Sequence, residues 1–379
     1  MRALALALAT ALLSVAGAAA RGPSAKIAYV HGRQALLIYA GSPLRQPIDL
    51  PQTGPPRFSG DGRLVSFGGY IVAGGVRLPT SDLSWAPTGE RAAYVTNAGG
   101  VLVWSPSRTQ QVVPDGWGAT GVAWSGDGAL ALGRAVCKGA CGLPTNTAVW
   151  VWRNGVLRKL VETPDRGRPQ PIAWHNGHVL WWDWPNSGSI AADGVALYQD
   201  GRRIATTLMY GDYVDACGQH LAVAAGGDRY AMHGKRILFD GRDVSRDPTR
   251  SWVSPSCTAN GRLVAAASAN AVPNRIGREH RAIWTLRPVR RQLTHPPSGW
   301  TDEYPHLLAD GSVAFVRTRQ VPFLKNGESW TTTHAKLELL RVGELTRLQQ
   351  FTFSSPDSSG DFLNYYGHYD WPSRLAVAQ

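Results

Sequence analysis

Long apolar segments are scarce in this sequence of 379 residues, and only the N-terminus carries one. After residue 20, no run reaches the roughly 20 apolar residues that a membrane-spanning helix needs, which excludes a membrane span there. The N-terminal run covers residues 3–16, follows Met1 and Arg2, and precedes small residues that fit an A-x-A cleavage site. This layout is typical of a secretory signal peptide. We therefore expect residues 1–20 to be a signal peptide and the mature protein to be secreted, either extracellular or periplasmic.

Charged residues are also few, at 17% of the chain, and only six of them are Lys. The net charge of +12 therefore comes from Arg, and the Arg residues are scattered, with their densest cluster at Arg287, Arg290 and Arg291. A nucleic-acid-binding domain needs a basic stripe, so we expect no nucleic-acid partner. A scattered basic surface favours anionic partners such as cell-surface polymers.

Cysteine is limited to four residues. An even number in an exported chain predicts two disulfide bonds. Three pairings are possible, and we favour Cys137 with Cys141 in a small loop and Cys217 with Cys257. Zinc binding is the alternative, but only Cys137 and Cys141 have ligand-like spacing and no His lies near them. We therefore expect no metal site.

Motifs that carry common enzyme chemistry are missing as well. The sequence has no Gly-x-Ser-x-Gly nucleophile elbow, no His-Glu-x-x-His zinc motif and no phosphate-binding Gly-x-x-x-x-Gly-Lys loop. These absences exclude the hydrolases, metalloproteases and nucleotide-binding proteins that depend on such motifs. We predict no catalytic residue and no cofactor.

Glycine and tryptophan, in contrast, are abundant, with 42 and 15 residues, and both mark a repeated phrase. The clearest copies are residues 57–67, 84–95 and 123–132, each with an aromatic residue, a Gly-containing turn and an apolar strand. Asp-Gly and Asn-Gly turns supply the positive φ values of a tight turn, so the phrase predicts a β-hairpin of two strands, a and b. Copies of strand a are expected near Phe58, Trp85, Trp124, Trp174, Asp215, Ser256, Leu307 and Trp371.

Two further strand-like runs, c and d, follow most hairpins, as in residues 148–152 and 157–161. Four strands at a spacing mostly near 40 residues are the signature of a β-propeller. We therefore predict that residues 21–379 form a single all-β propeller domain. Counting strand a gives eight blades, with seven as the alternative because only 27 residues separate Phe58 from Trp85.

The ends of the sequence predict how the ring closes. The chain starts with a strand of type b at residues 26–30 and ends with a strand of type a and residues 374–378. This offset lets the C-terminal strand complete the N-terminal blade. Closure also removes sheet edges that would otherwise invite aggregation.

One segment carries the repeat in its fullest form. It reads Ile-Trp-Thr-Leu at 283–286, Arg-Gln-Leu-Thr at 291–294, Asp-Glu-Tyr-Pro at 302–305 and Ala-Asp-Gly-Ser-Val-Ala-Phe-Val at 309–316. It resembles the WD40-like (PD40) repeat of bacterial TolB-type propellers, and degenerate copies cover nearly the whole mature chain. The resemblance implies the fold strongly and the function weakly. TolB's additional N-terminal α/β domain is not matched, so TolB's own partners do not carry over.

The two faces of a propeller carry different loops. The a–b and c–d turns form a short-turn face, and the b–c and d–a connections form a long-loop face. Insertions at residues 134–147, 183–194, 268–281 and 317–334 place the long loops on the second face, where binding residues are usually found. Clustered aromatic residues mark protein or sugar contacts, although about half of these rings are expected to pack between blades. The predicted ligand-binding residues are Trp117, Tyr210, Tyr213, Trp252, Trp300, Asp302, Tyr304, Tyr365, Tyr366 and His368.

The leading functional hypothesis is a monomeric, non-enzymatic binding module for an envelope protein or a glycan. The alternative is a polysaccharide lyase or glycosidase at the central mouth, which would bring Asp302, Glu303 and His368 together. Asp302, Glu303, Tyr304 and His306 form one polar cluster in the sequence, and His368 lies in another. A third possibility is a stand-alone relative of the propellers that gate prolyl-peptidase-like hydrolases, which would need a partner chain.

Overall fold

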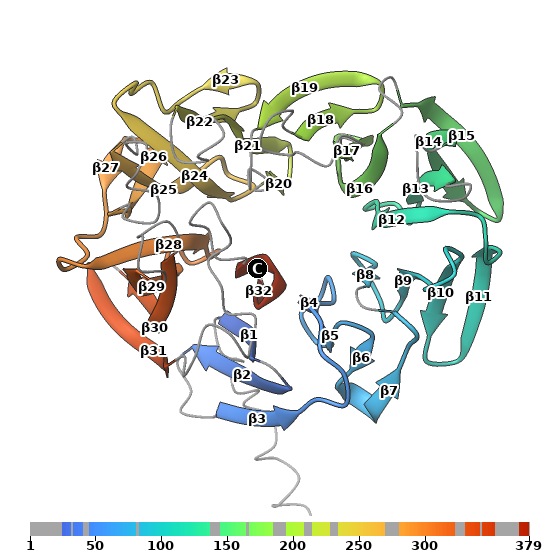
Figure 1. Cartoon of the computed structure of the whole chain (residues 1–379), viewed down its shortest axis with the longest axis horizontal. Coiled ribbons are helices and arrows are strands. Elements are labelled where there is room, and N and C mark those ends of the chain that lie inside the picture. The colour runs from blue at the N-terminus through green and yellow to red at the C-terminus, as the bar shows by residue number, and fades with distance from the viewer. Residues whose placement is uncertain are drawn as a thin grey trace, which may run out of the picture.

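The chain folds, in a computed structural model, into an all-β ring of eight blades (Figure 1). Six blades are separate four-stranded antiparallel sheets, and the other two are joined by a bridge between Thr207 and Gly226. This is an eight-bladed β-propeller. No helix in the described part of the chain is long and apolar enough to cross a membrane. The structure describes residues 25–31, 33–40, 45–80, 83–136, 145–163, 167–184, 195–207, 214–227, 234–269, 280–322, 330–341, 343–352 and 371–378.

The first four blades follow one another around the ring, and each runs from strand a to strand d. Blade 1 contains β32 (Leu375–Ala378), β1 (Ala25–His31), β2 (Gln34–Ala40) and β3 (Arg45–Asp49). Blade 2 contains β4 (Pro56–Phe58), β5 (Val65–Phe67), β6 (Tyr70–Ile71) and β7 (Val76–Arg77), with the 3-10 turn η1 (Ala73–Gly75). Blade 3 contains β8 (Ser84–Trp85), β9 (Ala92–Val95), β10 (Val101–Ser105) and β11 (Arg108–Val113). Blade 4 contains β12 (Ala119–Trp124), β13 (Leu130–Val136), β14 (Thr145–Arg153) and β15 (Val156–Glu162).

The other four blades continue around the ring. Blade 5 contains β16 (Arg168–His175), β17 (His178–Trp184), β18 (Val195–Gln199) and β19 (Arg202–Thr207). Blade 6 contains β20 (Val214–Cys217), β21 (His220–Gly226), β22 (Lys235–Phe239) and β23 (Arg242–Asp243). Blade 7 contains β24 (Arg250–Cys257), β25 (Leu263–Ala269), β26 (Ala282–Arg287) and β27 (Arg291–Gln292). Blade 8 contains β28 (Trp300–Leu307), β29 (Val313–Pro322), β30 (Trp330–Arg341) and β31 (Glu344–Thr352).

The repeated turn forms the a–b hairpin through its own side chains. In blade 4 the Ser125 amide donates to the Ala129 carbonyl at 2.8 Å, and the Ser125 hydroxyl donates to Asp127 at 2.5 Å. Gly128 follows with a φ of +84°, a conformation that strains any residue with a Cβ atom. The Ser-x-Asp-Gly phrase therefore closes the turn by hydrogen bonds and places a glycine where the backbone has a positive φ, which glycine adopts without strain.

The ring closes as the ends of the sequence predict. Strand β32 pairs antiparallel with β1, with Ile27 opposite Val377, and becomes strand a of blade 1. In Figure 1 the C-terminal β32 lies at the inner end of the blue blade. Trp371, which we expected in a strand, instead lies in the 3-10 turn η2 (Trp371–Ser373), and its buried ring packs in the core between blades 8 and 1.

Blade 2 explains the short interval that made seven blades an alternative. Its four strands contain only two or three residues each. Strands β5 and β6 are joined directly at Gly68 and Gly69, with no b–c insertion. A complete blade therefore fits into the 27 residues between Phe58 and Trp85, and the count of eight is correct.

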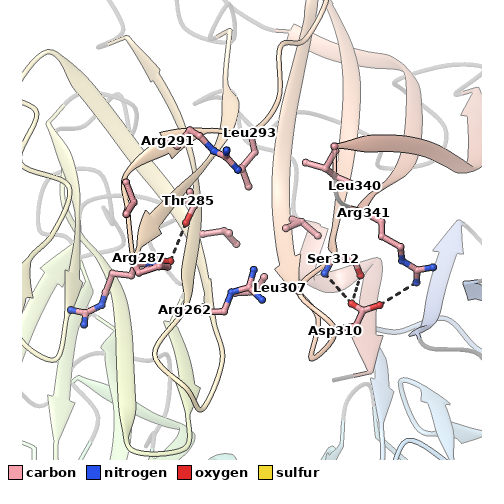
Figure 2. Close-up of a pocket in the computed structure, with 16 residues that line it drawn as sticks. Arg262, Thr285, Arg287, Arg291, Leu293, Leu307, Asp310, Ser312, Leu340 and Arg341 are labelled. Carbon is pink, nitrogen blue, oxygen red and sulfur yellow. Dashed lines mark hydrogen bonds and ion pairs between the residues drawn. The ribbon is translucent and has the colours of Figure 1, made fainter.

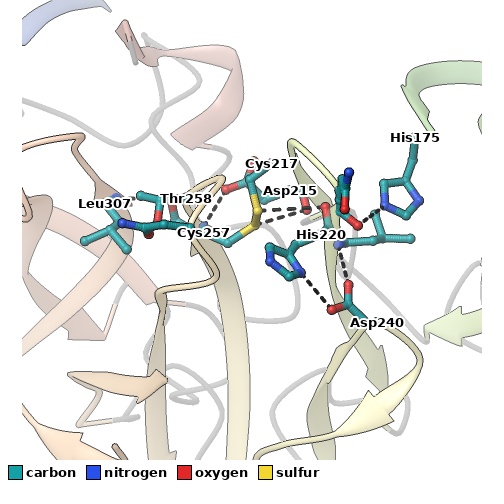
Figure 3. Close-up of a disulfide and its surroundings, with 12 residues drawn as sticks. His175, Asp215, Cys217, His220, Asp240, Cys257, Thr258 and Leu307 are labelled. Carbon is teal, nitrogen blue, oxygen red and sulfur yellow. Dashed lines mark hydrogen bonds and ion pairs between the residues drawn. A yellow bond between two sulfur atoms is a disulfide. The ribbon is translucent and has the colours of Figure 1, made fainter. Parts of the chain in front are cut away.

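A disulfide bond between Cys217 and Cys257 links blades 6 and 7, as predicted (Figure 3). The two Cα atoms are 5.9 Å apart, within the range that a disulfide spans. Beside the bond, the Asp215 carboxylate accepts a hydrogen bond from the Cys257 amide at 2.7 Å. Burial raises the pKa of Asp215, although this amide and Ser256 both lower it. The predicted partners Cys137 and Cys141 lie outside the described residues.

Candidate functional site

Half of the predicted ligand-binding residues belong to the described part of the chain. These five lie in strand a or immediately before it, in blades 4, 7 and 8: Trp117, Trp252, Trp300, Asp302 and Tyr304. The remaining five lie outside the described residues: Tyr210, Tyr213, Tyr365, Tyr366 and His368.

Trp252 belongs to the core and not to a surface. Its side chain has no exposed area, and its ring meets Trp284 edge-on with 5.8 Å between centroids. The Arg250 guanidinium lies over the Trp284 ring, 4.9 Å from its centroid. Trp252 packs here because β24, the inner strand of blade 7, lies against blade 6, where a large apolar ring fills the interface. It cannot contact a ligand without unfolding of this interface.

Asp302 forms a buried ion pair in the inner strand of blade 8. Both of its oxygens accept hydrogen bonds from Arg317 on β29, at 2.6 and 2.9 Å. The side chain of Asp302 has no exposed area, and the hydrogen bond to it raises the pKa of Arg317. A carboxylate held by both oxygens in this way joins two strands and has no lone pair directed at solvent.

Glu303 is held just as firmly, on the opposite side of β28. Its Oε1 accepts a hydrogen bond from Arg281 at 2.9 Å, and its Oε2 accepts one from the Trp371 indole at 2.9 Å. Thr318 also donates to Oε1 at 3.3 Å. Glu303 therefore connects blades 7 and 8 to the turn that precedes the ring-closing strand. Both carboxylates that the enzyme hypothesis requires are thus engaged by ion pairs and hydrogen bonds inside the blade.

Tyr304 and His306 occupy an irregular part of β28. The pairing with β29 shifts between Glu303 and His306, and Tyr304 has a φ of +50°. The two rings meet edge-on at 4.5 Å, and His306 Nε2 has no hydrogen-bond partner among the described residues. Burial lowers the pKa of His306 to about 4, so the imidazole is neutral at physiological pH. Tyr304 itself stays half-buried beside the blade 8 core.

Trp117 and Trp300 are the two candidates that combine an accessible ring with a neighbouring cation. The Arg134 guanidinium lies 4.9 Å from the Trp117 ring centroid, and its Nε donates to the Trp117 carbonyl at 2.9 Å. The Lys336 ammonium lies 4.2 Å from the Trp300 ring centroid. Both pairs lie at the long-loop ends of their blades, and both rings are half-buried. Such a pair offers an apolar surface and a positive charge together.

A second feature lies on the short-turn face, where we did not predict a site. A cavity of about 450 Å³ opens between blades 7 and 8, next to the a–b and c–d turns of both (Figure 2). Four arginines line it: Arg262, Arg287, Arg291 and Arg341. The Arg287–Arg291 cluster was visible in the sequence, but its position between two blades was not. In the described part of the chain, no group of three or more His, Cys, Asp or Glu side chains could hold a metal ion.

No protein-family model and no curated protein matches the chain. Among solved structures, an acylaminoacyl peptidase from Pyrococcus horikoshii is 13% identical with a TM-score of 0.46, over 84% of this chain and 48% of the peptidase. This chain thus spans about half the length of that protein. The β-propeller domain of the Trilobed protease from Pyrococcus furiosus is 12% identical with a TM-score of 0.40, over 69% and 90%. A glucose dehydrogenase-type oxidoreductase from Thermus thermophilus is 14% identical with a TM-score of 0.31, over 71% and 98%. The eight-bladed fold follows from the sheet topology of the chain itself.

Proposed function

We propose that this chain is an exported, non-enzymatic binding module of the cell envelope, built as a monomeric propeller of the TolB-type WD40-like class. Its partner is an envelope protein or a glycan, which binds to the long-loop face. The Cys217–Cys257 bond supports the export part of this proposal, because disulfides persist in oxidising compartments.

The observation that carries the proposal is the pairing of the acidic residues that follow the half-buried Trp300 in β28. Asp302 and Glu303 are paired with Arg317 and Arg281 in the interior of blade 8. A glycosidase needs one carboxyl group that can give up a proton and a second that can attack or activate water. Asp302 and Glu303 are buried and bound to guanidinium groups, so they do not face a ligand at the surface, and this supports a role in holding the blade.

The accessible aromatic–cation pairs support binding at the same face. Trp300 with Lys336 and Trp117 with Arg134 present flat rings next to positive charge. Sugar rings stack on such aromatic faces, and acidic substituents or acidic protein side chains pair with the cations. The basic chain, at +12, adds long-range attraction for an anionic partner.

The proposal is tested with residues 21–379 on an array of envelope and extracellular glycans and by binding to isolated envelope proteins. The Trp300→Ala and Trp117→Ala variants should each weaken binding of the strongest ligand about tenfold or more, as expected for a central aromatic contact. Leu345→Ala is the matched control, because Leu345 is 43% exposed on the outer strand of blade 8. Turnover of a bound glycan by the wild-type chain, or equal affinity of all three variants, would contradict the proposal.

A further inference from the structure

The cavity on the short-turn face arises from a substitution within the repeat. Trp124 stands immediately before Ser125, whose amide closes the a–b turn of blade 4, and Leu307 stands immediately before Leu308, whose amide closes the same turn in blade 8. Leu307 therefore occupies the position of Trp124. The smaller side chain leaves empty the space that the indole ring fills between blades 3 and 4.

The same substitution removes the partner of an arginine. Arg91 and Arg262 occupy equivalent positions, because the carbonyl of each accepts the turn-closing hydrogen bond of blade 3 or blade 7. The Arg91 guanidinium packs on the ring of Trp124 in the next blade, 5.3 Å from its centroid. Arg262 faces Leu307 in the next blade instead. Its guanidinium lies so close to the blade 8 turn that a Cβ atom at Gly311 would be 2.3 Å from its Nη1.

The positive charge in the cavity is not neutralised by the described residues around it. Asp310 is the only acidic residue in its described lining, and it already accepts hydrogen bonds from Ser312 and Arg341. Burial raises the pKa of Asp310, but the hydrogen bonds from Ser312 and the charge of Arg341 outweigh it, so the pKa lies below its usual value. Within the described residues, neither Arg262 nor Arg291 has a carboxylate partner.

The remaining lining determines which part of a ligand would fit. Arg287 directs its guanidinium away, onto the Phe239 ring at 5.0 Å, so it contributes charge at the rim. Figure 2 shows Arg262 between the two blades, across from Asp310 and Ser312. The walls are aliphatic: Val264, Leu293, Leu307, Val313 and Leu340. The cavity thus joins an apolar interior to two guanidinium groups that no described carboxylate neutralises.

We propose that this cavity binds a small aliphatic oxyanion, with the hydrocarbon part against the walls and the carboxylate or phosphate held by Arg262 and Arg291. A guanidinium group presents paired N–H donors that match two oxygens of such an anion. A volume of about 450 Å³ lies within the usual range of small-molecule sites. The site lies on the face opposite to the aromatic–cation pairs, so it is independent of the proposed envelope partner.

The test is isothermal titration of residues 21–379 with four ligands that share one eight-carbon chain. These are octanoate, octyl phosphate, 1-octanol and octyltrimethylammonium, all below their critical micelle concentrations. Octanoate or octyl phosphate should bind with one-to-one stoichiometry, and their relative affinities distinguish a carboxylate site from a phosphate site. Binding of 1-octanol or the cation as tight as that of both anions would overturn the proposal, as would the absence of binding by either anion.

Two variants and one control complete the experiment. Arg262→Gln should weaken anion binding about tenfold or more, because a hydrogen bond to a charged group is lost. Leu307→Trp should abolish binding by filling the cavity as Trp124 does in blade 4. Arg158→Gln is the matched control, because Arg158 is an exposed arginine on β15, across the ring. An equal loss in Arg158→Gln and Arg262→Gln would refute a specific site. Because Arg262 is exposed, its variant remains informative even if Leu307→Trp fails to fold.

Discussion

Replacing Cys217 and Cys257 by alanine removes the covalent bond between blades 6 and 7. The resulting loss in the free energy of unfolding can be calculated from the length of the segment that the bond closes. The bond closes a segment with a sequence separation of 40 residues. In the chain-entropy description, a loop of this size restricts the unfolded state by about 4 kcal/mol at 25 °C. Unfolding entropy near 2.1 cal/mol/K per residue, over the 359 residues of 21–379, converts this into a decrease in Tm of about 5 °C.

Differential scanning calorimetry of the oxidised double variant and the wild type measures this difference. Because the effect comes from the cross-link, Cys217→Ala, Cys257→Ala and the double variant should lose nearly the same stability. The Cys137→Ala/Cys141→Ala variant serves as the control, because it keeps the bond between the blades. A decrease in Tm below about 1 °C in the double variant would refute the reasoning. It would mean that residual contacts between the two blades already restrict this segment in the unfolded chain.

Three further predictions concern buried charge, pH and the second disulfide. Asp302→Asn leaves Arg317 buried without its carboxylate and should cost about 3–5 kcal/mol in urea denaturation, whereas Asp302→Leu/Arg317→Met should cost clearly less. The His306 pKa of about 4 in the folded chain lies below its ordinary 6.5. As the pH falls, the unfolded chain therefore binds a proton at His306 before the folded chain does. The free energy of unfolding should be constant in this respect above pH 6.5 and should decrease by up to about 3 kcal/mol as the pH falls to 4. His306→Phe should make the free energy of unfolding less dependent on pH over this range. Peptide mapping of the non-reduced protein should recover Cys137 bonded to Cys141, and free thiols at both positions would contradict that pairing.

The fold could be predicted because its determinants are local and repeated. Each Asp-Gly or Asn-Gly turn specifies a hairpin over a few residues, and the offset between the two ends of the sequence specifies ring closure. The Cys217–Cys257 pair was also predictable, because the two cysteines occupy equivalent places at the end of strand a in adjacent blades. Trp371 was placed in a strand because its surroundings copy the repeat. Proline at residue 372 has no amide hydrogen for a sheet, which accounts for a turn there.

The chemistry of the candidate sites was harder to predict, because it depends on contacts between strands far apart in the sequence. Asp302 and Glu303 look like a reactive pair beside aromatic residues. Their partners Arg317 and Arg281 meet them only through the register of β28 with β29 and the packing of blade 7 on blade 8. Trp252 and Trp300 both lie near the start of strand a in their blades, yet inter-blade packing buries only Trp252 completely. The arginine cavity depends on Leu307, which in blade 8 occupies the position that Trp124 occupies in blade 4. This difference can be recognised only after the two blades are aligned by their turn-closing hydrogen bonds.

Ring closure by β32 also has a kinetic consequence. Strands β1, β2 and β3 are the first of the ring to be synthesised, but blade 1 has no inner strand until residues 375–378 follow. The pairing of β1 with β32 joins opposite ends of the sequence, as between Lys26 and Ala378, and contacts of such large sequence separation form slowly. Until they form, the inner edge of β1 remains an unpaired template for other strands. The chain therefore has to persist as an open ring until β32 completes the blade that β1, β2 and β3 began.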